Sequence, residues 1–138
     1  MVDKYYSLIE IEKIKLSTGS IIKIFNNEKE LKSIKEIYCS TINYSTIREW
    51  KKHKFMTLKI LITSGKFKFV FPMNNFRRHE HIIMSSNENK LLIIKPGVWF
   101  SFIGLNKSKN SLINFSNILH DEDELLRKKI EKKYFDWF

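Results

Sequence analysis

The sequence predicts an all-β fold: a double-sheet jelly roll of short antiparallel strands that ends in a short C-terminal helix. About ten short apolar segments recur along the chain, roughly eight to twelve residues apart, and turn residues separate them. Several segments alternate apolar with polar residues, so one face of each strand is expected in a core. Residues 121–129 place acids before bases, an order that complements a helix dipole and predicts a helix there.

The first half of the chain is expected to form strands around a polar insert. The strands are expected at residues 8–16, 21–25 and 34–42, and the insert at residues 26–33 is expected to be a helical turn or a loop. In the segment 34–42, Tyr38 lies on one face, whereas Ile37 and Cys39 lie on the other. With no base beside it, Cys39 is expected to be a buried thiol.

The central stretch, residues 48–71, is expected to contain a tight hairpin. Its two apolar runs, 56–62 and 67–71, flank Gly65, and glycine accepts the positive φ that tight hairpin turns need. Pro72 follows the second run and is expected to end that strand. Further strands are expected at residues 80–84, 91–95, 98–103 and 111–118, with a type II turn at Pro96-Gly97.

Size and composition indicate a single domain, residues 1–138. This length suffices for a hydrophobic core, and a single cysteine excludes an internal disulfide, so we expect a cytoplasmic protein. The apolar runs are shorter than the roughly 18 residues that a membrane span needs, so no membrane association is expected. The net charge of +10 suggests an anionic partner, but the lysines are scattered, which favours a phosphate-bearing small ligand over nucleic acid.

Three motifs occur in order along the chain. They are W-x-x-H-K-x-x-T at residues 50–57, P-G-V-W at residues 96–99, and Asp136-Trp137. Together they resemble the dTDP-4-dehydrorhamnose 3,5-epimerase family of cupins, and the resemblance runs from about residue 21 to residue 137. It implies a cupin-type jelly roll that forms a homodimer, needs no metal or other cofactor, and serves the biosynthesis of surface polysaccharide such as lipopolysaccharide.

The resemblance also implies a reaction on a nucleotide-linked 4-keto-6-deoxy sugar. In that family a histidine removes the proton beside the ketone and a tyrosine returns one on the opposite face. Carried over to this chain, His53 is the base and Arg48 binds a phosphate, while Lys51 stands where close relatives often carry a second histidine. We also expect Lys54, which follows the histidine, and Trp99 of the P-G-V-W motif at the substrate.

The acid of the reaction has no direct counterpart in this chain. The family's tyrosine is expected in the strand 111–118, which contains none, and Ile113 or Asn114 occupies its place. We therefore expect Asn114 at the substrate and either Tyr38 or Tyr44 as the acid. The nearest candidate for the family's histidine-orienting aspartate is Glu131.

Two alternatives stay open at this point. His79 and His81 have the H-x-H spacing that places two imidazoles on one face of a strand, as in a metal site, but no third ligand is evident. A metal site is therefore the weaker interpretation. The missing tyrosine favours, as the alternative to an enzyme, a non-catalytic cupin that binds a nucleotide sugar or a protein of the same pathway.

Overall fold

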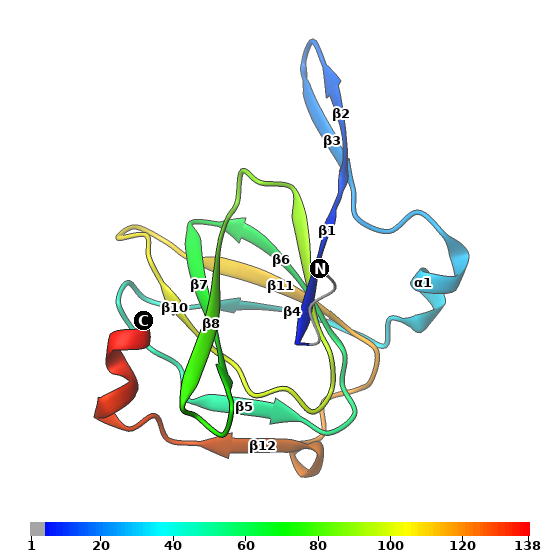
Figure 1. Ribbon diagram of the computed structural model, residues 1–138. Coiled ribbons are helices and arrows are strands. Elements are labelled where there is room, and N and C mark those ends of the chain that lie inside the picture. Colours follow the sequence, from blue (N-terminus) through cyan, green and yellow to red (C-terminus); the bar gives the residue numbers. More distant parts are fainter. Residues whose placement is uncertain (1–4) are drawn as a thin grey trace.

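A computed structural model describes residues 5–138, which form two facing β layers (Figure 1). The first layer is a five-stranded antiparallel sheet in the order β1-β9-β6-β11-β4. Its strands are β1 (Tyr6–Glu10), β9 (Lys90–Ile94), β6 (Leu58–Ser64), β11 (Ser111–Ser116) and β4 (Glu36–Thr41).

The second layer consists of two pieces that backbone bridges join. The strands of these pieces are β10 (Ser101–Gly104), β7 (Lys66–Met73) and β8 (Arg78–Ser85), and then β12 (Leu125–Lys128) and β5 (Trp50–His53). A bridge between Lys51 and Phe100 ties β5 to the start of β10. The layer therefore runs β12-β5-β10-β7-β8, and the all-β architecture predicted from the sequence is confirmed.

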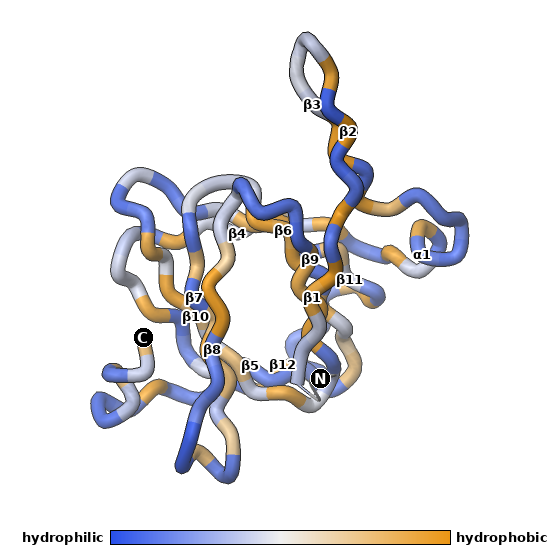
Figure 2. The backbone as a smooth tube through the Cα atoms, turned by 45° about the horizontal axis from the view of Figure 1, so that its top comes forward, coloured by the Kyte–Doolittle hydropathy of each residue, from blue (hydrophilic) through white to orange (hydrophobic). Residues whose placement is uncertain are grey.

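The core lies between the layers and contains mainly aromatic and branched side chains. The predicted alternation on β7 is confirmed, because Phe67, Phe69 and Phe71 are fully buried. The other main members of the core are Met56, Leu58, Ile60, Ile62, Met84, Leu92, Ile94, Phe100, Phe102 and Leu112. Figure 2 shows the two layers facing each other and the hairpin of β2 (Glu12–Leu16) and β3 (Gly19–Lys23) standing away from them.

The predicted hairpin at Gly65 was wrong. β6 and β7 flank this glycine, but they belong to different sheets and do not pair. Gly65 has a φ of 77° and turns the chain from one layer to the other. The buried Asn110 side chain stabilises this corner, since its Oδ1 accepts from the backbone N–H of Lys66 at 3.1 Å and of Asn106 at 2.9 Å.

Several other local expectations also need correction. The segment 8–16 forms two strands, β1 and β2, rather than one. Pro72 does not end its strand, because it pairs with His79 within the β7–β8 ladder. The polar insert contains the helix α1 (Glu28–Ser33), whose N-terminus the Asn27 side chain caps. Cys39 is exposed rather than buried, because its face of β4 points away from the core.

The helix predicted at residues 121–129 was wrong. The acids form a single 3-10 turn, η1 (Glu122–Glu124), capped by Asp121, and the chain then continues as β12 along β5. The C-terminal helix is instead the 3-10 helix η2 (Lys132–Trp137), which places Trp137 against the buried Trp50, with 6.1 Å between ring centroids. Among residues 5–138, no helix combines the length and apolar character that crossing a bilayer requires.

Candidate functional site

Two adjoining hollows lie beside β5. The inner cavity has a volume of about 60 Å³ and lies between the layers; its lining residues are Tyr38, Ser40, Arg48, Lys51, His53, Leu58, Ile60, Phe100, Phe102, Leu112 and Asn114. The vestibule, of about 310 Å³, has as its lining residues Glu36, Tyr38, Lys51, His53, His120, Leu125 and Arg127. Tyr38, Lys51 and His53 line both hollows and so mark the junction between them.

His53 is held at the junction by a buried carboxylate. It is the last residue of β5 and pairs with Leu125 of β12, which brings the preceding Glu124 beside the ring. The imidazole Nδ1 donates to Glu124 Oε1, and both side chains are buried. No group among residues 5–138 forms a hydrogen bond with Nε2. The pairing therefore places the proton on Nδ1 and leaves Nε2 as the nitrogen available to a ligand.

The Glu124 carboxylate is itself fixed by the backbone. Its Oε2 accepts hydrogen bonds from the N–H groups of Phe55 at 3.1 Å and Met56 at 3.2 Å. Burial disfavours the charged form, but the hydrogen bonds from His53 and from these two N–H groups outweigh it, so the pKa of Glu124 lies below its usual value. Glu124 is thus an ionised carboxylate at neutral pH, suited to stabilise an imidazolium on His53.

This arrangement predicts how stability depends on pH. A carboxyl whose pKa is lower in the folded state contributes its full stabilisation above its unfolded pKa and loses it as the pH falls through the folded pKa. We expect the difference in free energy of unfolding between the wild type and Glu124→Gln to shrink as the pH falls below the ordinary value of 4.5. Urea unfolding at a series of pH values measures this difference, and a gap that stays constant down to acid pH would contradict the assignment.

Tyr38 is oriented by Asn114. The two residues are directly opposite each other in the β4–β11 ladder, and Asn114 Nδ2 donates to the Tyr38 hydroxyl oxygen at 2.7 Å. The Asn114 orientation is fixed because its Oδ1 accepts from the backbone N–H of Lys59 at 2.9 Å. Since the phenol oxygen accepts from Asn114, its own proton is free to be donated elsewhere. Burial raises the pKa of Tyr38, which keeps that proton in place at neutral pH.

Three cationic side chains surround the hollows. Arg48 lines the inner cavity, and its Nη2 donates to the Thr41 carbonyl at 2.6 Å. Arg127 lines the vestibule, where its guanidinium pairs with Glu49 and Glu122, each at 2.9 Å. Lys51 lies between them at the junction, and burial, then the nearby Arg127 and Arg48, lower its pKa. The site therefore offers positive charge to an anionic ligand in both hollows.

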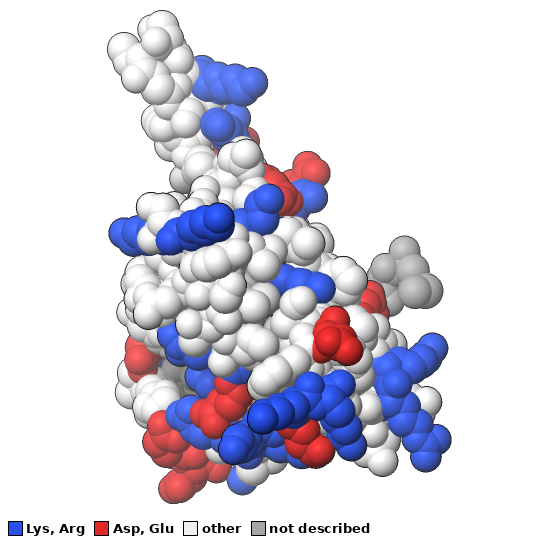
Figure 3. Space-filling view, turned by 90° about the vertical axis from the view of Figure 1, so that its left-hand side faces the viewer, with Lys and Arg blue, Asp and Glu red and all other residues white. Residues whose placement is uncertain are grey.

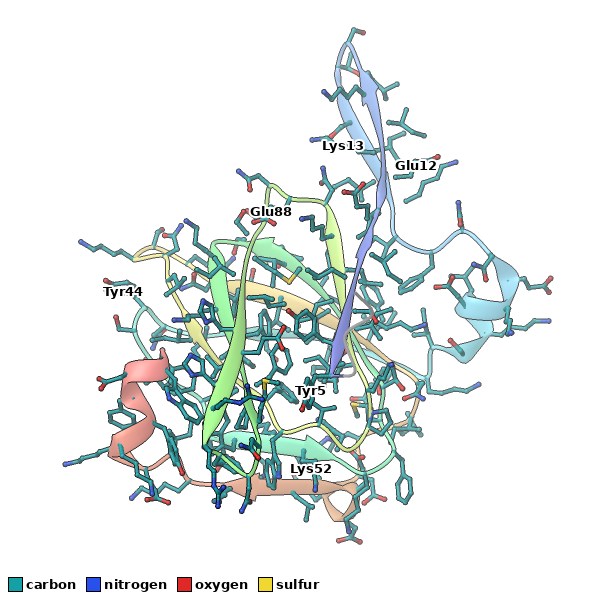
Figure 4. The ribbon with its side chains drawn as sticks, viewed as in Figure 1. Tyr5, Glu12, Lys13, Tyr44, Lys52 and Glu88 are labelled. Carbon is teal, nitrogen blue, oxygen red and sulfur yellow. The ribbon has the colours of Figure 1, made fainter. Side chains whose placement is uncertain are left out.

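The structure does not bring every residue predicted from the sequence to this site. Lys54 is exposed and its Nζ donates to the Asp123 carbonyl at 3.1 Å. Trp99 lies outside both hollows and packs on Phe76, with ring centroids 6.2 Å apart. Tyr44 lies at the outer edge of the molecule, away from β5, and is 47% exposed (Figure 4). Of the two candidate tyrosines, only Tyr38 lies beside His53.

The H-x-H pair lies apart from the two hollows. The rings of His79 and His81 stack with centroids 5.7 Å apart, and His79 also stacks on Trp137 at 4.7 Å. In the part of the chain that the structure describes, no three His, Cys, Asp or Glu side chains are arranged to hold a metal ion. On the face shown in Figure 3, basic and acidic side chains are interspersed over the lower end rather than gathered in one basic stripe.

Glu124 is the main site residue that the sequence did not assign. Glu131, the candidate predicted for its role, is exposed and pairs with Lys133 at 3.6 Å. One signal was present, because Glu124 is the last acid of the run 121–124 and the only one followed by apolar residues. That pattern predicts where the segment turns inward, but it does not show which strand it meets.

Comparisons with known proteins match the fold. No protein-family model and no curated protein matches the sequence. A dTDP sugar isomerase from Desulfovibrio desulfuricans G20 superposes with a TM-score of 0.80 at 20% identity, covering 96% of this chain and 88% of that one. A mutant of the 3,4-ketoisomerase QdtA from Thermoanaerobacterium thermosaccharolyticum, in complex with TDP-4-keto-6-deoxyglucose, superposes with a TM-score of 0.79 at 19% identity. This match covers 99% of this chain and 95% of the ketoisomerase. The fold is the cupin jelly roll.

An epimerase from Mycobacterium tuberculosis, rmlC, shares this cupin fold over a smaller part of its length. Its TM-score is 0.74 at 11% identity, and the match covers 90% of this chain but 68% of the epimerase. Identities at this level establish a common fold. The chemistry of this protein therefore has to be derived from its own side chains.

Proposed function

We propose that this cupin is a sugar-nucleotide isomerase, a 3,4-ketoisomerase that moves the ketone of a TDP-linked 4-keto-6-deoxy sugar from C4 to C3. The observation that carries the proposal is the buried His53–Glu124 pair. His53 lines both hollows, and its Nε2 is left available to a ligand. An imidazole ionises near neutral pH, which suits the removal and return of a proton beside a ketone. The carboxylate stabilises the imidazolium formed in between.

The first half of the reaction uses His53 and Tyr38. His53 Nε2 takes the proton from C3, and the electron pair of that C–H bond forms the C3–C4 double bond. The former ketone oxygen on C4 then takes the proton of the Tyr38 hydroxyl, which Asn114 leaves free for donation. The product of this half-reaction is an enediol. In the second half, O3 loses its proton, a carbonyl forms at C3, and C4 takes the proton back from His53.

Two observations favour a ketoisomerase over the 3,5-epimerase that the resemblance implied. An epimerase returns the proton on the opposite face and needs an acid there, but β11 contains no tyrosine, and Ile113 or Asn114 stands in its place. Ketone transfer needs only one carbon base that gives back the proton it removed. The match in length agrees with this choice, since the chain covers 95% of the ketoisomerase but 68% of the epimerase.

The size of the hollows suggests how the substrate is divided between them. The inner cavity is the smaller of the two, which favours the reacting part of the sugar there and the nucleoside with its phosphates in the vestibule. There the Arg127 guanidinium can exchange its surface carboxylates for phosphate oxygens. The homodimer, the cytoplasmic location and the role in surface polysaccharide stay predictions that come with the resemblance.

The proposal is tested by supplying the substrate and observing the product. The purified protein is incubated with TDP-4-keto-6-deoxyglucose, and the sugar is followed by NMR and, after borohydride reduction, by mass spectrometry of the resulting deoxyhexoses. We expect the 3-keto sugar to accumulate. Epimers at C3 and C5 with the ketone still at C4 would contradict the ketoisomerase assignment. Calorimetric binding of the sugar nucleotide without any conversion would favour the non-catalytic alternative.

A further inference from the structure

We propose that Lys51 is the second acid–base residue of this site, the group that takes the hydroxyl proton from O3 of the sugar. This inference rests on the proposed ketone transfer and completes it. Moving a ketone from C4 to C3 requires a hydroxyl proton to leave O3 while another arrives at O4. His53 is occupied with the carbon-bound proton and Tyr38 with O4, so a further proton acceptor is needed.

The position of Lys51 is the first observation behind this assignment. It is one of the three residues that line both hollows, together with His53 and Tyr38. Its backbone is fixed by two hydrogen bonds with Phe100, one in each direction, at 2.9 and 3.0 Å. The side chain therefore starts from a rigid strand next to the base and reaches the junction where the sugar ring enters.

The charges around Lys51 are the second observation. Its cross-strand neighbour in the β5–β12 ladder is Arg127, a like charge directly opposite, which is unfavourable unless other groups compensate. Glu49 and Glu122 compensate Arg127 through hydrogen bonds of 2.9 Å, whereas no carboxylate among residues 5–138 lies within ion-pair distance of Lys51. A lysine that lies beside cations and has no carboxylate partner loses its proton more readily, because deprotonation removes the repulsion.

The remaining neighbours make the protonated form of Lys51 less favourable. Burial and the charges of Arg127 and Arg48 lower the pKa of Lys51, and they outweigh the opposing effect of Glu49 and Glu122. A lysine with a lowered pKa is a competent base. Arg127 lines only the vestibule, so binding of the phosphates does not require Lys51.

The proton balance closes with these three residues. After His53 and Tyr38 have produced the enediol, the Lys51 amine takes the proton from O3. The O3 electron pair forms the new carbonyl at C3, and the electrons of the C3–C4 double bond take the proton from His53 at C4. The Lys51 ammonium then returns one proton to the Tyr38 phenolate. Every group regains its starting state, and no external oxidant or reductant is consumed.

The test compares two substitutions at position 51. Lys51→Arg keeps a positive charge but cannot accept a proton, because a guanidinium stays protonated in proteins. We expect it to lower formation of the 3-keto sugar at least about a hundredfold. Deuterium from the solvent should still enter at C3 of the unconverted sugar, and TDP should still bind in calorimetry. Lys51→His restores a titratable base and should keep the rate within about tenfold of the wild type.

The control and the contrary outcomes are distinct. Lys52→Arg changes the neighbouring lysine, which lies over the Trp99 ring outside both hollows, and should behave as the wild type. Isomerisation by Lys51→Arg at the wild-type rate would overturn the inference and show that only the charge matters. Loss of TDP binding in Lys51→Arg would also overturn it, because the substitution would then act on ligand binding rather than on proton transfer. A wild-type protein that neither exchanges nor isomerises would instead reject the proposed function itself.

Discussion

Replacement of His53 by glutamine is expected to lower the rate of ketone transfer by about a thousandfold, because general acid–base catalysis by a positioned side chain contributes this much. Within residues 5–138, the His53 imidazole is the only ring at the junction of the two hollows with a carboxylate on one nitrogen and no hydrogen-bond partner on the other. Without it nothing removes the proton at C3. Deuterium incorporation at C3 should therefore disappear together with the product, unlike in Lys51→Arg. Turnover and exchange are both measured by NMR in deuterated water.

The control for His53→Gln is His81→Gln, which removes an imidazole that lines neither hollow. It should leave turnover unchanged. His53→Gln should also bind TDP with nearly the affinity of the wild type, because the vestibule keeps Arg127. Exchange at C3 that persists at the wild-type rate in His53→Gln would show that another group is the base. Glu124→Gln should give an intermediate rate, since the base is present but its imidazolium is no longer stabilised.

Local sequence patterns identified one half of the site. The motif around His53 and the alternation on β4 single out His53 and Tyr38, which the structure brings together at the junction of the two hollows, because side-chain direction in a strand follows from parity. Glu124 lies 71 positions away from His53, and their contact depends on β12 pairing with β5. No local pattern gives that pairing. The prediction of Glu131 instead of Glu124 reflects this limit.

The predicted helix at residues 121–129 shows the same competition between local and tertiary effects. Its charges fit a helix dipole, which contributes a few tenths of a kcal/mol to about 1 kcal/mol for each side chain. The segment contains only two apolar residues, Leu125 and Leu126, and these are adjacent rather than on one helical face. Pairing with β5 and the buried hydrogen bonds of Glu124 outweigh the dipole, so the chain is extended there.

The corner at Gly65 gives the second large expected effect. Gly65→Ala should lower the free energy of unfolding by about 3 kcal/mol, the sum of left-handed strain and overpacking. The glycine has a φ of 77°, and an added Cβ would overlap the Lys109 carbonyl oxygen and lie 2.6 Å from Asn110 Oδ1. Relief of this overlap has to move backbone or displace the buried Asn110 side chain. Thermal unfolding should shift downward by about 10 °C.

Gly97→Ala, at a different turn, separates the backbone strain from the overpacking. Gly97 has a similar φ of 82°, but an added Cβ meets nothing within 4 Å, so only the backbone strain of about 1 kcal/mol is expected. A tight hairpin at Gly65, as the sequence suggested, would leave the Cβ in open space and make the two substitutions equally costly. If the chain instead crosses between the layers at Gly65, Gly65→Ala should lower the free energy of unfolding more than Gly97→Ala does. Equal unfolding free energies for the two variants would therefore contradict the corner and favour the hairpin.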